Sequence, residues 1–411
     1  MPDFLTPALI VFVLTYVGVA LGGIPGLAID RTGIALLGAV AMVACGALDT
    51  SHAVAAIDFP TILLLYGLMV LSSQLRLGGF YTRVALGLTS AMDRPRRFLW
   101  VSMAASAALS AVLTNDIVCL AFAPVLAWTV TRRSLNPLPF LLGLAIASNI
   151  GSAATIIGNP QNMLLGQVGH LSFDRFFAWC LVPSSLALIA AYGLICWRYR
   201  GKWQQGGRAF GPGESSEWPA YQAGPSRKGL IVGALLVAAF FTPIPRELSA
   251  LAAAALLMCS RRMRTRSLMG FVDWHLIALF CGLFVVVRGF ELTGWPARLV
   301  SQWQAHGFNL AEPFTLTASA AALSNVVSNV PAVMLLTKFL DVNEPRAWYI
   351  LAVAGTFAGN LITIGSIANL IVIEQAKLAG VVIRFREHAR IGVPVTLVSL
   401  AILCGWIFIA P

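Results

Sequence analysis

The chain has 411 residues, of which 58% are hydrophobic and only 11% charged, and its formal net charge is +11. This composition excludes a soluble globular domain and a disordered chain, and it indicates an all-α polytopic membrane protein. The basic residues fall in loops between apolar segments and form no stripe with aromatic residues, so nucleic acid is not expected as a partner. The seven cysteines show no CxxC pattern, so neither a disulfide framework nor a metal site is expected.

The first half of the chain carries apolar segments that are long enough to cross a bilayer. We expect full spans at about 8–24, 33–48, 60–76 and 177–197. Two shorter apolar arms, at about 98–113 and 117–131, meet at the polar tip Thr114-Asn115-Asp116. Because a complete crossing needs ~20 apolar residues, these arms predict a re-entrant helical hairpin rather than two crossings.

A further apolar span of the first half is broken by Asn, Gly, Ser, Thr and Pro over 149–162. The later segment 199–228 is rich in Gly, Ser, Pro and Gln, and it predicts an aqueous, cytoplasmic linker. The second half then repeats the plan of the first. It has spans near 229–244, 247–260, 273–289 and 391–409, a hairpin over 312–341 with its tip at 328–330, and a span broken over 359–369.

Residues of the first half recur in the second half at nearly constant spacing. The spacing is 215 for Arg31 and Arg246, for Asp58 and Asp273 and for Gly67 and Gly282, 214 for Asn115 and Asn329, and 207 for Gly158 and Gly365 and for Asn162 and Asn369. These spacings predict a duplicated unit, with one repeat over 1–198 and the other over 229–411. Each repeat has an odd number of crossings, about five plus the hairpin, so we expect the repeats in inverted orientation. Inverted repeats with broken helices are typical of secondary transporters whose site lies near mid-bilayer.

The distribution of positive charge gives an independent prediction of the topology. With the N-terminus outside, most of the 28 Lys and Arg lie in the predicted cytoplasmic loops. We therefore expect both termini outside a bacterial or archaeal cytoplasmic (inner) membrane.

The two hairpin tips and the two broken spans form the candidate binding site. Unpaired backbone groups at membrane depth are tolerated only where they are packed in protein or line a wet cavity. Amide and hydroxyl side chains, with the N-H groups of the helix starts, suit a small polyhydroxyl solute or an ion. The alternatives are helix packing for a glycine and bonding to the own helix for a hydroxyl. The candidate residues are Thr114, Asn115, Asp116, Asn149, Gly151, Thr155, Gly158, Asn159, Asn162, Asn325, Ser328, Asn329, Asn360, Gly365 and Asn369.

Asp116 is the acidic residue predicted at the middle of an apolar segment. A carboxylate at that depth must be neutralised, paired with a cation or hydrogen-bonded, so Asp116 is the candidate for binding the coupling ion. The alternative is a structural acid held by backbone amides at the hairpin tip, and Glu374 is then the next candidate. The residue at the matching position of the second tip, Val330, has no charge, so the coupling chemistry is expected to be asymmetric.

The pattern NxGxxxTxxGxPxN, which contains Asn149, Gly151, Thr155, Gly158, Pro160 and Asn162, resembles the ion transporter superfamily. That superfamily includes divalent-anion/sodium symporters, arsenite efflux pumps and NhaD-type sodium/proton antiporters. The first tip, with Asn115-Asp116, is similar to the arsenite pump (ArsB-like) branch and departs from the Ser-Asn-Thr of the dicarboxylate symporters. The second tip, Ser328-Asn329-Val330, keeps Ser-Asn only. The resemblance implies an elevator motion and a homodimer, with a soluble ATPase as a further candidate partner.

These observations predict a secondary active transporter that exports arsenite or antimonite with the proton as coupling ion. Arg and Lys are absent from all four polar breaks, and the nearest along the chain is Lys338, which suits an uncharged solute. The alternatives are sodium- or proton-coupled transport of an inorganic or carboxylate anion, and sodium/proton antiport. The sequence contains neither GxxxxGK[ST] nor HExxH, so ATP hydrolysis by this chain is not expected, an enzyme is disfavoured and no cofactor is predicted.

Overall fold

The computed structural model describes residues 7–23, 26–204, 219–261, 263–305, 309–310 and 312–410. Within these residues the regular structure is helical, with two isolated β-bridges and no strand. Four of the described helices are long and apolar enough to cross a membrane, namely α4 (Phe59–Leu77), α10 (Phe173–Arg198), α14 (Trp274–Leu292) and α20 (Phe385–Ile409). The prediction of an all-α polytopic membrane protein is confirmed.

The first half contains the expected spans, hairpin arms and broken span. The remaining helices of this half are α1 (Pro7–Leu21), α2 (Arg31–Ala44), α3 (Thr50–Ala55), α5 (Phe80–Leu88), η1 (Thr89–Ala91), α6 (Pro95–Val112), α7 (Asn115–Arg132), α8 (Pro137–Ser152) and α9 (Pro160–Val168). The hairpin arms are α6 and α7, and the broken span is α8 followed by α9. The sequence analysis did not predict the short helices α3 and α5.

The second half follows the same order of elements. Besides α14 and α20 it has α11 (Ala223–Ala239), α12 (Arg246–Met258), α13 (Thr265–Met269), α15 (Trp295–Ala305), α16 (Pro313–Val327), α17 (Asn329–Leu336), η2 (Thr337–Phe339), α18 (Pro345–Ala358), η3 (Thr363–Gly365) and α19 (Ile367–Leu378). Helix α11 already begins at Ala223, inside the segment 199–228 that we predict as a linker. Residues 205–218 of that segment lie outside the described residues.

Aspartates at matching positions start corresponding helices of the two halves. The Asp58 side chain accepts a hydrogen bond from the Thr61 N-H at 2.8 Å at the start of α4. The Asp273 side chain accepts one from the Leu276 N-H at 2.9 Å at the start of α14. Each carboxylate satisfies one of the backbone donors that a helix leaves free at its first turn. The repeated aspartates therefore mark the same local structure.

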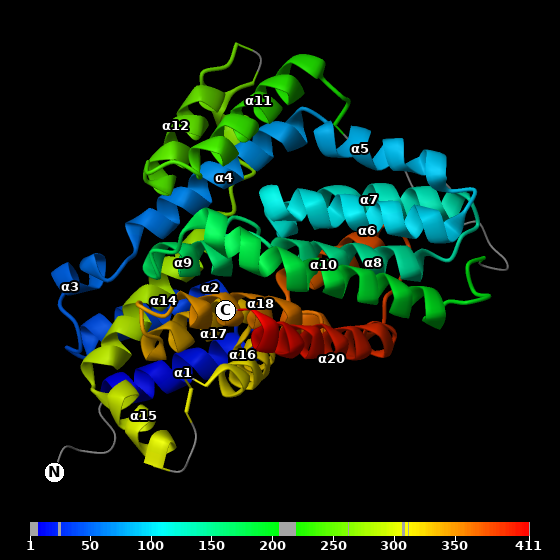
Figure 1. Cartoon of the computed structure of the whole chain (residues 1–411). Coiled ribbons are helices and arrows are strands. Elements are labelled where there is room, and N and C mark those ends of the chain that lie inside the picture. Colours follow the sequence, from blue (N-terminus) through cyan, green and yellow to red (C-terminus); the bar gives the residue numbers. More distant parts are fainter. Residues whose placement is uncertain are drawn as a thin grey trace.

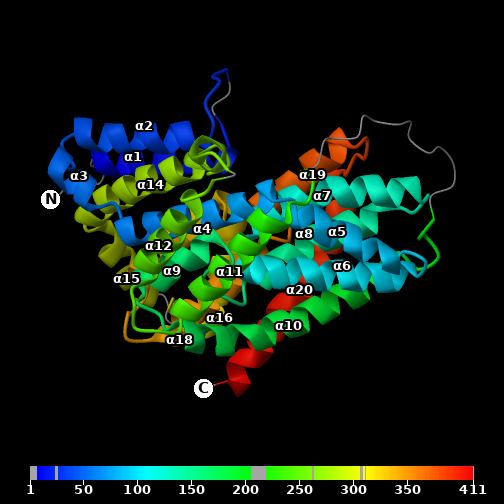
Figure 2. The ribbon, with the colours of Figure 1, turned by 90° about the horizontal axis from the view of Figure 1, so that it is seen from above.

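The two halves exchange contacts rather than packing as separate units. Helix α4 packs on α12 and α14 packs on α2, while α7 packs on α19 and α9 on α17. In Figure 1, α11 and α12 lie together against α4. Figure 2 shows α1, α2, α3 and α14 at one end of the molecule and α5, α6, α7 and α8 at the other. The division at 198 and 229 and the inverted orientation of the halves stay predictions.

Two glycines allow the long helices to cross their partners closely. A Cβ added at Gly67 would lie 2.6 Å from the Ala250 carbonyl oxygen, and one added at Gly282 would lie 2.8 Å from the Ala35 carbonyl oxygen. The two contacts are related by the same spacing of 215, because both the glycines and the alanines are that far apart. Small residues at such crossings are typical of packed membrane helices.

We predict that Gly67→Ala and Gly282→Ala each destabilise the protein by about 1–3 kcal/mol, because the added methyl forces the backbones apart. Thermal unfolding of the detergent-solubilised variants measures this. The control is Gly193→Ala in α10, where nothing lies within 4 Å of the added Cβ. Equal melting temperatures for all three variants would contradict the close crossing.

Candidate functional site

Each hairpin turns at one residue with an unusual backbone conformation. Thr114, between α6 and α7, has φ 47°, and Ser328, between α16 and α17, has φ 75°. Positive φ is uncommon for residues other than glycine and costs about 1–3 kcal/mol. The two residues occupy matching positions in the two halves, so the strained turn is part of the repeated design. It places Asn115 and Asn329 at the first positions of α7 and α17.

One asparagine in each half replaces the hydrogen bonds that the broken helix loses. The Asn162 Nδ2 donates to the carbonyl oxygens of Thr155 at 2.9 Å and Ser152 at 3.2 Å. The Asn369 Nδ2 donates to those of Ile362 at 3.3 Å and Gly359 at 2.8 Å. The carbonyls of Ile362 and Gly359 lie 207 residues after those of Thr155 and Ser152, which is the repeat spacing. The carbonyls freed by each break are thus satisfied by a side chain, which membrane-embedded backbone requires.

Asn149, on α8, connects polar breaks of both halves. Its Oδ1 accepts hydrogen bonds from Asn115 Nδ2 at 3.1 Å and from Ser366 Oγ at 2.9 Å. Its Nδ2 donates to Asn360 Oδ1 at 2.9 Å and lies 3.3 Å from Asn369 Oδ1. All five side chains are buried. We call them the amide cluster, and they hold the first hairpin, α8 and the second broken span in one unit.

A central cavity of about 30 Å³ lies where the four breaks meet. It has room for about one water-sized group. Four helices, α7, α9, α17 and α19, begin at its wall, and a helix start carries partial positive charge. The cavity is lined by Asn115, Asp116, Asn159, Pro160, Gln161, Leu276, Ser328, Asn329, Val330, Ser366 and Ile367. Residues far apart in the sequence therefore form one polar site.

Three acceptor atoms at this site have no hydrogen-bond partner among the described residues. They are the side-chain oxygens of Asn115, Asn329 and Thr114. A buried acceptor left unpaired costs about 1–3 kcal/mol. A hydroxylated solute or a cation at the cavity would supply the missing partner.

Asp116 lines the central cavity and also a side cavity of about 100 Å³. Arg76, Asp273 and Phe271 line this side cavity as well. Within the described part of the chain, the Asp116 side chain has no hydrogen-bond partner, whereas a structural acid held by backbone amides would have several. Glu374, the alternative candidate, is exposed on α19 and lines neither cavity.

The candidate residues divide into three groups. Asn115, Asp116, Asn159, Ser328 and Asn329 line the central cavity, and Thr114 lines the side cavity. Asn149, Asn162, Asn360 and Asn369 hold the chain behind the cavity through the bonds described above. The remaining candidates make packing contacts or hydrogen bonds to backbone carbonyls, namely Gly151, Thr155, Gly158, Asn325 and Gly365.

The members of this last group make packing contacts or hydrogen bonds away from the central cavity. A Cβ at Gly151 would lie 2.3 Å from the Ala107 carbonyl oxygen, and one at Gly158 would lie 2.2 Å from that of Ser152. The Thr155 hydroxyl donates to the Ala111 carbonyl, and the Asn325 Nδ2 donates to two carbonyls at 3.0 Å. Gly365 packs against Asn325. None of the five lines the central cavity.

The sequence analysis missed several residues that the structure brings to the site. Gln161 and Ser366 line the central cavity, and Gln161 donates to the Thr356 hydroxyl at 2.5 Å. Arg76, treated as a topology signal, lines the side cavity with its guanidinium 4.5 Å from the Phe271 ring centroid. Arg76 is therefore near the site in space, although Lys338 is nearer along the chain. Asp273 lines the side cavity together with Arg76, and it repeats Asp58 at the spacing of 215. This repetition was the one sequence signal for the side cavity.

We predict that Asn149→Ala destabilises the protein by about 2–4 kcal/mol, because it leaves Asn115, Asn360 and Ser366 without their buried partner. The melting temperature in detergent measures this. The control is Asn343→Ala, which removes an exposed hydrogen bond to Asp341. If Asn149→Ala and the control have the same melting temperature, the amide cluster does not hold the halves together.

Comparison with known proteins places this geometry in a family. A family model described as a citrate transporter matches residues 9–354. An uncharacterized transporter of Mycobacterium tuberculosis is 29% identical, with 98% of this chain and 97% of that protein covered. The silicon efflux transporter of Oryza sativa subsp. japonica is 27% identical, with 92% of each chain covered. A putative transporter arsB of Dictyostelium discoideum is 24% identical over 92% of this chain and 87% of its own length.

The family and these relatives are transporters and not enzymes. The resemblance to the ion transporter superfamily is thus confirmed. The chain is an integral membrane transporter that belongs to the citrate transporter family.

Proposed function

We propose that the protein is a secondary active transporter that exports arsenite or antimonite in exchange for protons, with the central cavity as the solute site. The observation that carries the proposal is the lining of this cavity. Amides, hydroxyls and four helix starts surround it, and no Lys or Arg is among its described lining residues. At neutral pH arsenite is mostly an uncharged trihydroxide, which such a lining suits.

The donors and acceptors of a trihydroxide match those of the cavity. Its O-H groups can donate to the unpartnered oxygens of Asn115 and Asn329. Its oxygens can accept from the backbone N-H groups of Gln161 and Ile367, which lie at the starts of α9 and α19 and line the cavity. A trihydroxide is larger than the one water-sized group for which the cavity has room, so binding requires the two hairpin tips to separate.

The names of two relatives support an uncharged cargo. One is a silicon efflux transporter and another is a putative transporter arsB. Silicic acid and arsenite are both small hydroxides that are mostly uncharged at neutral pH. A site built from amides and helix starts can serve either of them, because both present hydroxyls around one central atom.

Asp116 is proposed as the group that carries the coupling proton. It is the acidic residue of the central cavity, and it also faces the side cavity, where Asp273 is exposed. A carboxylate shared by the two cavities can exchange a proton with water on one side and respond to the solute on the other. Its protonation would then change which solutes the central cavity accepts.

The proposal places the protein in the cytoplasmic membrane with both termini outside, as a homodimer. The hairpins and broken spans would move as one unit, because the amide cluster ties the first hairpin to the second broken span and Asn325 of the second hairpin donates to the Ala358 carbonyl of α18. The scaffold would be the crossed pairs α4 with α12 and α2 with α14, which pack closely at Gly67 and Gly282.

A second candidate is sodium- or proton-coupled transport of a carboxylate anion. Two observations favour it. The matching family model is described as a citrate transporter. Four helix starts favour an anion, and Arg76 lines the adjacent side cavity.

Flux through proteoliposomes separates the two candidates. We expect arsenite or antimonite flux out of the compartment that represents the cytoplasm. This flux should rise when a proton gradient is directed into that compartment. Citrate, succinate, sulfate and sodium are the comparison solutes, and liposomes without protein give the background. Sodium-dependent uptake of citrate with no metalloid flux would reject the first candidate and support the second.

We predict that Asp116→Asn abolishes the acceleration by a proton gradient, with at least about a tenfold fall in coupled flux, while solute exchange at equal pH persists. The amide is nearly isosteric with the carboxyl group but cannot release a proton at neutral pH. The control is Asp93→Asn, at an exposed position in a loop. Normal gradient-driven flux in Asp116→Asn would show that Asp116 does not carry the proton.

A further inference from the structure

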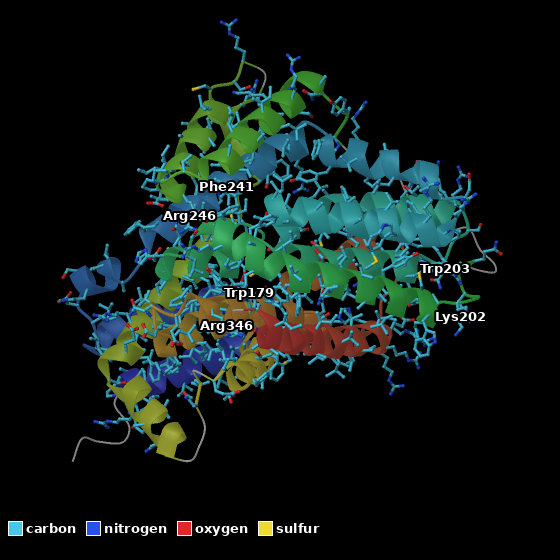
Figure 3. The ribbon with its side chains drawn as sticks, in the orientation of Figure 1. Trp179, Lys202, Trp203, Phe241, Arg246 and Arg346 are labelled. Carbon is cyan, nitrogen blue, oxygen red and sulfur yellow. The ribbon has the colours of Figure 1, made fainter. Side chains whose placement is uncertain are left out.

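Two side-chain contacts join the first turn of α12 to the end of α9. The Arg246 Nη2 donates to the Gly166 carbonyl oxygen at 2.8 Å. The Gln167 Nε2 donates to Glu247 Oε2 at 3.1 Å. We call these four residues the first latch. It borders a pocket of about 490 Å³ that Phe241 and Arg246 both line, and Figure 3 labels both residues there.

The repeat spacing identifies the residues that correspond to the first latch. Arg246 and Glu247 correspond to Arg31 and Thr32 of α2, and Gly166 and Gln167 correspond to Ile373 and Glu374 of α19. The correspondence is structural, because the spacing of 207 also relates the carbonyls bonded by Asn162 and Asn369. The spacing of 215 relates the two close crossings at Gly67 and Gly282.

The corresponding set has the same chemistry as the first latch. The first latch holds Arg246 and the carboxylate of Glu247. The corresponding set holds Arg31 and the carboxylate of Glu374. Each also holds one neutral polar side chain, Gln167 in the first and Thr32 in the second.

In this structure the second set is not joined. The Arg31 side chain has no hydrogen bond or ion pair with any other residue that the structure describes, and the Glu374 side chain is exposed. The Thr32 hydroxyl donates to the His275 carbonyl of α14, at 3.3 Å. The two halves therefore differ in conformation at matching positions.

The packing of the broken helices shows the same difference. Helix α9 packs on α4, whereas α19 makes no comparable contact with α14 within the described part of the chain. A transporter with inverted repeats opens to the opposite side when one repeat or bundle moves against the other. When each half adopts the conformation of the other, the first latch opens and the second set comes together.

We propose that Arg31 and Glu374 form an ion pair in the state that is open to the opposite side, and that this second latch replaces the first. This inference rests on the proposed alternating transport, although its test needs no transported solute. The two latches exclude each other, because each belongs to one of the two arrangements of the halves. Arg31, Arg246, Glu247 and Glu374 then act as positioning residues that set the balance between the two states.

The acceptor differs between the latches for a structural reason. Gly166 lies in the last turn of α9, which ends at Val168, so its oxygen accepts from the Leu171 N-H beyond the helix at 3.1 Å and also from Arg246. Helix α19 continues to Leu378, so the carbonyl of Ile373 is used within the helix. Arg31 needs a side-chain acceptor there, and Glu374 supplies it where the first half has Gln167.

Disulfide trapping tests the exchange in the full chain, with its seven native cysteines replaced. The pair Gln167→Cys with Glu247→Cys reports the present state, and Thr32→Cys with Glu374→Cys reports the opposite arrangement of the halves. The second pair removes the Glu374 carboxylate, so it tests the exchange and not the ion pair. A single hydrogen bond to a carbonyl adds little net stability, so opening the first latch with Arg246→Ala should raise the trapping of the second pair about twofold to fivefold. The matched control is Thr32→Cys with Leu378→Cys, about one helical turn further along α19, which should not respond.

A second measurement tests the ion pair itself. In the Arg246→Ala background, trapping of the Gln167→Cys and Glu247→Cys pair should fall, since the present state is less populated. Adding Arg31→Gln or Glu374→Gln should restore it, and both together should restore no more than either alone, as expected for partners in one contact. If Arg246→Ala is not monodisperse in detergent, Arg246→Lys keeps the charge and should act in the same direction with a smaller effect.

The outcomes separate this inference from the proposed function. Unchanged trapping of the second pair in the Arg246 variants, or an equal response of the control pair, would overturn the exchange of latches. Additive effects of Arg31→Gln and Glu374→Gln would overturn the ion pair. Absence of metalloid flux in proteoliposomes would reject the proposed function, while the trapping results would still decide on the latches.

Discussion

The structure depends on how its broken helices satisfy their backbone in an apolar surrounding. Each break frees carbonyls and N-H groups that lipid cannot solvate. Asn162 and Asn369 bond the freed carbonyls, and Asn159 and Ser366 bond N-H groups at the starts of α9 and α19. Because side chains complete these bonds, the breaks can persist as defined structure. The same side chains then leave the helix starts directed at one cavity.

The amide cluster has a consequence for the motion of the molecule. Asn149 bonds to partners in α7 and in the second broken span, so the first hairpin and the second half share a set of buried hydrogen bonds. Buried polar groups are costly to separate. The contacts at the ends of the broken helices are different, since Arg246 and Glu247 are only partly buried. A molecule built in this way is stiff around its site and weakly held where the site unit meets α12.

The electrostatics of the site follow from its asymmetry. The two tips share an asparagine at the first helical position, but Asp116 follows in one tip and Val330 in the other. The single carboxylate faces both cavities, and the side cavity brings Asp273 and Arg76 to the same region. Matching positions of the two halves therefore form the frame of the site, and the difference between Asp116 and Val330 sets its charge.

The sequence by itself determined the helical membrane architecture and the positions of the four polar breaks, and it predicts a duplication. These features are local: apolar runs reveal spans, and a polar cluster inside such a run reveals a break. Asn115, Asp116 and Asn329 were predicted in this way, and they line the central cavity. Only the tertiary structure decided that Gly151 packs against Ala107, that Thr155 bonds to Ala111, that Arg76 and Asp116 line one side cavity, and that Arg246 bonds to α9. These outcomes depend on how helices that are distant in the sequence cross each other. The residue pattern within one segment does not determine such crossings.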